Sequence, residues 1–138
     1  MPHLVILYTP ALDEMLDMGE LCRDAADAML AQRDEAGGQV FPTGGTRVLA
    51  FAAAHHAVAD GRRPYDFLYL NLRMAKGRSA AVHRQVGDAV LAAVRSRIDP
   101  LMDEHHIGVT LQIDEGAEVY DAKHSSIHPL FGGPPRKA

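Results

Sequence analysis

Pro2 is the residue whose position most clearly suggests chemistry, because it follows the initiator Met1 and directly precedes an apolar stretch that ends at Tyr8. Removal of Met1 would leave the secondary amine of Pro2 as the N-terminus. Such an amine acts as a base at neutral pH when burial or nearby cations lower its pKa from an ordinary value of about 8 or above. Arg47 and Arg78 are candidate cations, and each planar guanidinium could also hold a substrate carboxylate. These residues are compatible with a base beside an anion clamp, but residue types alone favour the alternative of an ordinary first proline and two solvated or ion-paired arginines.

The sequence lacks the motifs of other common chemistries. It contains no Gly-Lys-Ser/Thr phosphate loop, no dinucleotide fingerprint and no nucleophilic serine elbow, so we expect no nucleotide cofactor. Eight histidines are present, but the adjacent pairs at 55–56 and 105–106 would diverge on a helix or strand, and we predict no metal site. The lone Cys22 cannot form a disulfide within the chain and is expected to be a small buried hydrophobe.

Length and composition indicate one globular domain. The chain has 138 residues, of which 47% are hydrophobic and 23% charged, as in an ordinary domain with a packed core. A formal net charge of −4 and scattered basic residues disfavour nucleic acid as a partner. The apolar start at 4–8 is too short for a signal peptide, and no stretch approaches the roughly 20 apolar residues of a membrane span. We therefore expect a cytoplasmic protein without a membrane partner.

Hydrophobic periodicity predicts two strand-helix-strand units. The predicted strands cover 4–8, 47–54, 67–74 and 109–114, and the predicted helices cover 12–36 and 80–98. Ser79 is a plausible cap for the second helix, whereas Asp99-Pro100 predicts either a kink or a new turn after it. The units are offset by 63 residues, from His3 to Asp66, which indicates a structural duplication.

The two helices can cover one face of a four-stranded sheet, because each crossover connects parallel strands in the right-handed sense. The opposite face is also apolar in places: the first strand is apolar on both sides, and Phe67 and Tyr69 lie opposite the leucines of the third strand. Monomers rarely expose such a patch, so we predict that subunits cover it for each other.

Short motifs follow one another in a characteristic order along nearly the whole chain. They are Met1-Pro2-His3, Phe41-Pro42-Thr43-Gly44-Gly45-Thr46-Arg47, Ala59-Asp60-Gly61, Gly77-Arg78-Ser79, Gln112-Ile113-Asp114-Glu115 and Ile127-His128-Pro129-Leu130-Phe131. In this order and spacing they resemble the 5-carboxymethyl-2-hydroxymuconate isomerases of the tautomerase superfamily. The likeness covers residues 2–131, and residues 132–138 are predicted to be a flexible tail.

The resemblance implies an α+β fold in which two β-α-β halves, about 2–58 and 59–116, are related by a pseudo-two-fold axis in each subunit of a homotrimer. It implies that Pro2 moves a proton within an unsaturated dicarboxylate of the 2-hydroxymuconate type, with no metal or other cofactor, as in bacterial aromatic-acid catabolism. It also implies that Arg47 and Arg78 bind the substrate carboxylates and stabilise the dienolate, either from the same subunit or from a neighbour.

Weaker candidates for the pocket lining are His3, Tyr8, Tyr69, Arg73 and Ser79. His3 and His128 are expected to serve structure or subunit contact before they serve substrate. Two other functions stay open at this point: a general enol-keto tautomerase of phenylpyruvate-like acids, and a noncatalytic trimeric binding protein of the same fold.

Overall fold

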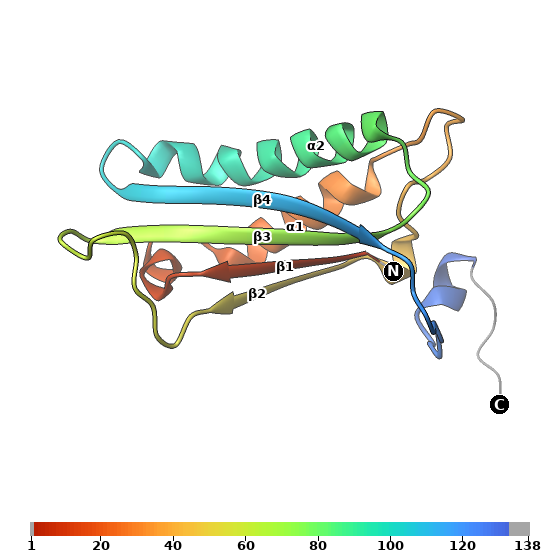
Figure 1. The fold of residues 1–138 in the computed structure, drawn as a ribbon, viewed down its shortest axis with the longest axis horizontal. Coiled ribbons are helices and arrows are strands. Elements are labelled where there is room, and N and C mark those ends of the chain that lie inside the picture. Colours follow the sequence, from red (N-terminus) through yellow and green to blue (C-terminus); the bar gives the residue numbers. More distant parts are fainter. Residues whose placement is uncertain (1, 133–138) are drawn as a thin grey trace.

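A mixed sheet of four strands forms the centre of the computed structural model, which describes residues 2–132. The strands are β1 (His3–Tyr8), β2 (Arg47–Ala52), β3 (Tyr65–Ala75) and β4 (His106–Gly116). Their order is β2-β1-β3-β4, with β1 parallel to β2, β3 parallel to β4, and the two pairs antiparallel where β1 meets β3 (Figure 1). The predicted fold class, two β-α-β units joined into one sheet, is confirmed.

Both long helices, α1 (Met18–Leu30) and α2 (Ala80–Ile98), pack on one face of this sheet and against each other (Figure 1). Alternate residues of the strands point into the core beneath them, as the period of two requires. The fully buried side chains of the sheet include Leu4, Ile6 and Leu70. One hydrophobic layer therefore holds the helices to the sheet.

The prediction of one continuous helix over 12–36 is wrong at both ends. A 3-10 turn, η1 (Pro10–Glu14), buries Leu12, and α1 begins only where the Asp17 carboxylate accepts the N–H of Glu20 at 3.0 Å. At its other end α1 stops at Leu30, and the carboxylate of Asp34 then accepts backbone N–H groups of the following loop. Local side-chain bonds of this kind compete with helix continuation, and hydrophobic spacing does not reveal them.

The second helix matches its prediction closely. The hydroxyl of Ser79 accepts the N–H of Val82 at 3.2 Å, and the buried side chains of α2 recur every fourth residue up to Ile98. Pro100 lies in a new 3-10 turn, η3 (Asp99–Leu101), so the alternative of a kinked helix is excluded.

None of the helices within residues 2–132 is long and apolar enough to cross a membrane.

The strands differ from their predicted lengths. β3 and β4 each have 11 residues and pair along their whole length, from Tyr65 with His106 to Ala75 with Gly116. Polar residues at their ends, which break the apolar alternation, are held in the ladder by backbone hydrogen bonds. β2 is shorter than predicted, because it ends at Ala52, the residue that pairs with the last residue of β1.

The face of the sheet opposite the helices, here called the open face, carries apolar side chains along β1 and β2. Leu7, Leu49 and Phe51 are 43%, 44% and 53% exposed. Leu7 lies in the strand that the sequence predicted to be apolar on both sides, whereas Leu49 and Phe51 were not part of that prediction. Polar side chains dominate the β3 and β4 part: Tyr69 Oη donates to Gln112 Oε1 at 2.8 Å. The open face is thus mainly apolar along the later residues of β1 and β2 and mainly polar along β3 and β4.

The chain beyond β4 is irregular until η4 (His128–Phe131). This short turn lies against η2 (Thr43–Gly45), and a Cβ atom at Gly44 would come within 3.0 Å of the Cα of His128. The close approach of the two backbones requires glycine at this position. Of the predicted tail over 132–138, all but Gly132 lie outside the described residues.

Candidate active site

Pro2 is buried at the start of β1, where it lines a cavity of about 240 Å³. Its carbonyl oxygen accepts the backbone N–H of Arg47 at 3.4 Å, which ties it to the beginning of β2. The other lining residues are Val40, Phe41, Pro42, Met74, Ala75, Arg78 and Lys123. Apolar side chains thus form most of the wall, and Arg78 and Lys123 add positive charge to it.

Strand direction brings Arg78 to this cavity from the other half of the chain. Because β1 and β3 are antiparallel, with His3 opposite Arg73, the start of β1 lies beside the end of β3. The chain leaves β3 through Gly77, whose φ of +111° is a conformation that favours glycine, and reaches Arg78 just before α2. The predicted meeting of Pro2 and Arg78 is therefore present within a single subunit.

Two contacts hold the guanidinium of Arg78 in place. Its Nη2 donates to the carbonyl of Val40 at 2.8 Å, and its Nη1 forms an ion pair with Oδ2 of Asp34 at 3.3 Å. The side chains of Arg78 and Asp34 are 32% and 24% exposed, so solvent only partly screens their attraction. A guanidinium has five N–H donors, and these two contacts leave capacity to bind an anion in the cavity.

Lys123 is a lining residue that the sequence did not reveal. It lies in the irregular segment between β4 and η4, and Figure 1 shows this segment passing beside the N-terminal end of β1. Its ammonium forms an ion pair with Asp121 and lowers the pKa of that carboxyl group. No periodicity or motif marks a single lysine in such a segment, so only the three-dimensional path of the chain identifies it.

Arg47 lies next to Pro2 in the sheet but is not among the residues that line this cavity in the described chain. It pairs with His3, and its Nη1 donates to the carbonyl of Gly45 at 3.0 Å. By the alternation of the strands, Arg47, His3 and Arg73 form one row on the open face. The three side chains therefore project from the open face and do not line the cavity, and their roles toward substrate stay predictions.

The remaining candidates do not line the cavity within the subunit. Tyr8 is at the opposite end of β1, where its hydroxyl donates to Asp13 at 2.7 Å; burial and this carboxylate raise the pKa of Tyr8 to about 12. Tyr69 belongs to the open face, and Ser79 donates to Glu35 while it caps α2. Each of these hydroxyls has a structural partner, and none lines the Pro2 cavity in this chain.

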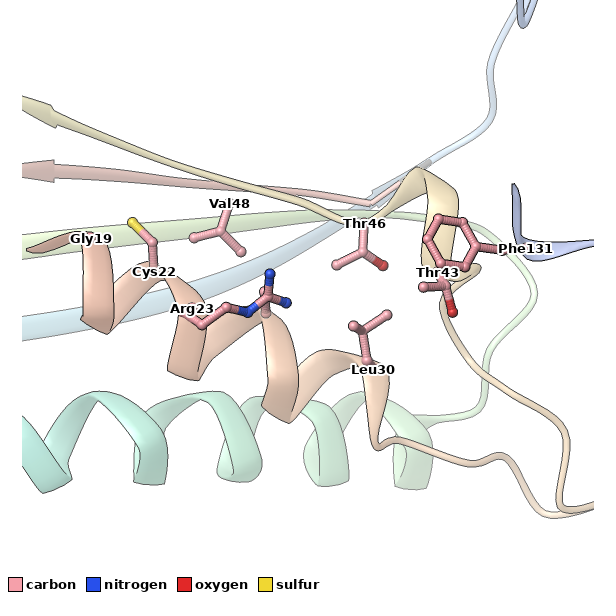
Figure 2. Close-up of a pocket in the computed structure, with 9 residues that line it drawn as sticks. Gly19, Cys22, Arg23, Leu30, Thr43, Thr46, Val48 and Phe131 are labelled. Atoms are coloured by element: carbon pink, nitrogen blue, oxygen red, sulfur yellow. The ribbon is translucent and has the colours of Figure 1, made fainter. Parts of the chain in front are cut away.

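A larger cavity of about 380 Å³ lies between α1 and β2 and contains none of the predicted site residues (Figure 2). Its wall includes Cys22, Thr46, Val48 and Phe131. Cys22 is half-buried, less than predicted, and burial raises the pKa of its thiol, which favours the neutral form. Over residues 2–132 no three metal-binding side chains of His, Cys, Asp or Glu converge, here or elsewhere.

The four-stranded sheet of two β-α-β units, with both helices on one face, is the fold of a tautomerase-type protein. Within this class, the chain belongs to the 5-carboxymethyl-2-hydroxymuconate isomerase family, whose sequence model matches residues 2–131. The predicted family and the predicted isomerase class are thereby confirmed.

Individual relatives agree with this assignment. A crystal structure of a 5-carboxymethyl-2-hydroxymuconate delta-isomerase is 55% identical, with a TM-score of 0.90 over 95% of this chain and 93% of the other. A 5-carboxymethyl-2-hydroxymuconate isomerase from Deinococcus radiodurans R1 is 29% identical, with a TM-score of 0.82 over 94% and 93% of the two chains. The 5-carboxymethyl-2-hydroxymuconate Delta-isomerase of Escherichia coli is 22% identical over 131 residues, which are 95% of this chain and 99% of the relative.

Proposed function

We propose that the protein moves a carbon-carbon double bond in an unsaturated dicarboxylate of the 2-hydroxymuconate type, with Pro2 as the acid and base after removal of Met1. The burial of Pro2 in a cavity that also contains Arg78 and Lys123 is the observation that carries the proposal. The name of the 55% identical relative supports the substrate class.

The reaction needs only one proton-transferring group. The Pro2 nitrogen takes a proton from one position of the substrate, the bonding pair moves into the conjugated system, and a dienolate forms beside the new ammonium. That ammonium returns the proton at another position, so the double bond moves and no atom is gained or lost. Apolar walls and nearby cations both disfavour the charged amine before the reaction, which keeps the base available near neutral pH.

In the proposed reaction, Arg78 stabilises the negative charge that develops on the substrate oxygen. Val40 and Asp34 fix its guanidinium before substrate arrives, so little reorganisation is needed when the charge develops. We propose that Arg47 contributes to substrate binding from the open face, where a neighbouring subunit would complete the site.

We propose that this assembly is the homotrimer. The exposed Leu7, Leu49 and Phe51 on the open face support the burial of this surface between subunits. Sedimentation at micromolar concentration should give the mass of three chains, and a stable monomer under these conditions would contradict the proposal.

The test of the reaction is the substitution Pro2→Ala in protein whose N-terminus has been verified by mass spectrometry. The change replaces the cyclic secondary amine with the mobile primary amine of an N-terminal alanine, and we expect it to lower kcat/KM for 5-carboxymethyl-2-hydroxymuconate, a muconate that bears a third carboxylate, by about 100- to 10,000-fold. Protein that retains Met1 should be similarly inactive, because the Pro2 nitrogen is then an amide. Pro10→Ala, the same change in an exposed proline at the far end of β1, is the matched control and should keep wild-type turnover. Unchanged activity in both Pro2 forms would exclude Pro2 as the base.

A further inference from the structure

The cavity that contains Pro2 has a second cation whose place in the chain differs from that of Arg78. We infer that Lys123 binds a substrate carboxylate that lies away from the reacting atoms and so makes the site selective for ligands with more than one carboxylate. This inference rests on the proposed function, because it assigns a role within the same site.

The two cations of the cavity are held differently. Arg78 is anchored by a carbonyl and by a carboxylate on another loop, so its position is fixed before substrate binds. Lys123 is paired with Asp121, only two residues away, and the two side chains are 43% and 46% exposed. An ion pair this exposed contributes little, because water screens the charges. A substrate carboxylate in the cavity can therefore replace Asp121 as the partner of the lysine.

Charge complementarity supports the same assignment. The guanidinium of Arg78 can donate hydrogen bonds both to one carboxylate and to a developing oxyanion. A second carboxylate in an apolar cavity needs its own cation. Within the described lining, Lys123 is the remaining positive side chain. Its four-carbon stem allows the ammonium to follow a carboxylate as a point charge, without the fixed geometry of a guanidinium.

The alternative is that the ion pair between Lys123 and Asp121 only stabilises the local conformation of the segment after β4. The two possibilities differ in their dependence on substrate. A lost carboxylate contact weakens the binding of diacids alone, whereas a displaced segment changes the wall of the cavity for every ligand.

The experiment compares Lys123→Met with Lys76→Met, the same change at an exposed lysine that does not line the cavity. For Lys123→Met we expect kcat/KM for 5-carboxymethyl-2-hydroxymuconate to fall by about 10- to 100-fold, mainly through KM. Lys123→Arg should restore most of this loss, since it restores the charge. Lys76→Met should behave as wild type.

Binding of unreactive acids gives a second readout that needs no turnover. Adipate and hexanoate have six carbons each and differ by one carboxylate, so the ratio of their inhibition constants isolates the second carboxylate site. We expect wild type to prefer adipate and Lys123→Met to lose that preference while its affinity for hexanoate is kept. Equal losses for both acids, or an unchanged preference, would overturn the role of Lys123.

The outcome is separable from that of the proposed function. If wild type isomerises 5-carboxymethyl-2-hydroxymuconate, Pro2→Ala lowers turnover as expected and Lys123→Met changes neither KM nor the adipate preference, only the inference about Lys123 fails. If wild type does not isomerise this substrate, the proposed function itself fails and the role of Lys123 in it fails too.

Discussion

Asp34 connects the loop after α1 to the candidate active site, and its replacement should affect both stability and catalysis. Its Oδ1 accepts the backbone N–H groups of Ala36 at 3.0 Å and Gly38 at 2.8 Å. Its Oδ2 forms the 3.3 Å ion pair with Arg78. Asp34→Ala removes all three contacts, whereas Asp34→Asn retains an oxygen for the two N–H groups and removes the charge.

The magnitude follows from these contacts. Two backbone hydrogen bonds of about 1 kcal/mol each, plus a partly screened ion pair of about 0.5 to 1 kcal/mol, predict that Asp34→Ala lowers the free energy of unfolding by about 2 to 3 kcal/mol. Asp34→Asn loses the ion pair alone, so its expected cost is about 0.5 to 1 kcal/mol. Asp27→Asn, which breaks an exposed helical pair with Arg23, is the control and should cost no more than about 0.5 kcal/mol.

Urea unfolding measures the three stabilities, and steady-state kinetics measure the effect on Arg78. In Asp34→Ala the guanidinium keeps its bond to the carbonyl of Val40 but loses its second anchor, so we expect kcat/KM to fall by about tenfold. If Asp34→Asn is as unstable as Asp34→Ala, the two backbone hydrogen bonds to Asp34 contribute much less than about 1 kcal/mol each. If Asp34→Ala keeps full activity, the ion pair does not position Arg78.

Two further changes test contacts away from the reacting atoms. Gly44→Ala would place a Cβ atom 3.0 Å from the Cα of His128, and because backbone cannot move aside cheaply we expect a loss of about 1 to 3 kcal/mol in urea unfolding. The raised pKa of Tyr8 means that the folded protein favours the neutral phenol; the stability from this group is complete below pH 10 and is lost as pH rises through about 12. Tyr8→Phe should therefore abolish part of the decline in unfolding free energy between pH 10 and 12, and an identical decline in both proteins would assign it to other groups.

The architecture was predictable because its signals are repetitive. Alternation in β3 placed Leu68, Leu70 and Leu72 on one face, and all three are buried in the core. The limits of the first helix were not predictable in this way, since the 3-10 turn before α1 buries Leu12 as a helix would. Local hydrogen bonds of single carboxylates decide such boundaries, and periodicity averages over them.

The candidate site was predictable only where a motif marked it. Pro2 and Arg78 belong to motifs on which the family resemblance rested, and both residues line one cavity. Lys123 and the anchoring Asp34 carry no such mark. Their places depend on how the segment after β4 and the loop after α1 return to the same end of the sheet, which involves contacts between residues far apart in sequence.

Strand direction explains why the cavity forms around the N-terminus at all. Because β1 is parallel to β2 and antiparallel to β3, the start of β1 is flanked by the start of β2 and by the end of β3. The turn before β2 and the turn after β3 therefore open at the same end of the sheet as Pro2. The first turn supplies Phe41 and Pro42 as apolar walls, and the second supplies Arg78 as the cation. In this topology Pro2, at the start of β1, lies beside residues of both β-α-β units, so one fold unit repeated twice can form an asymmetric cavity.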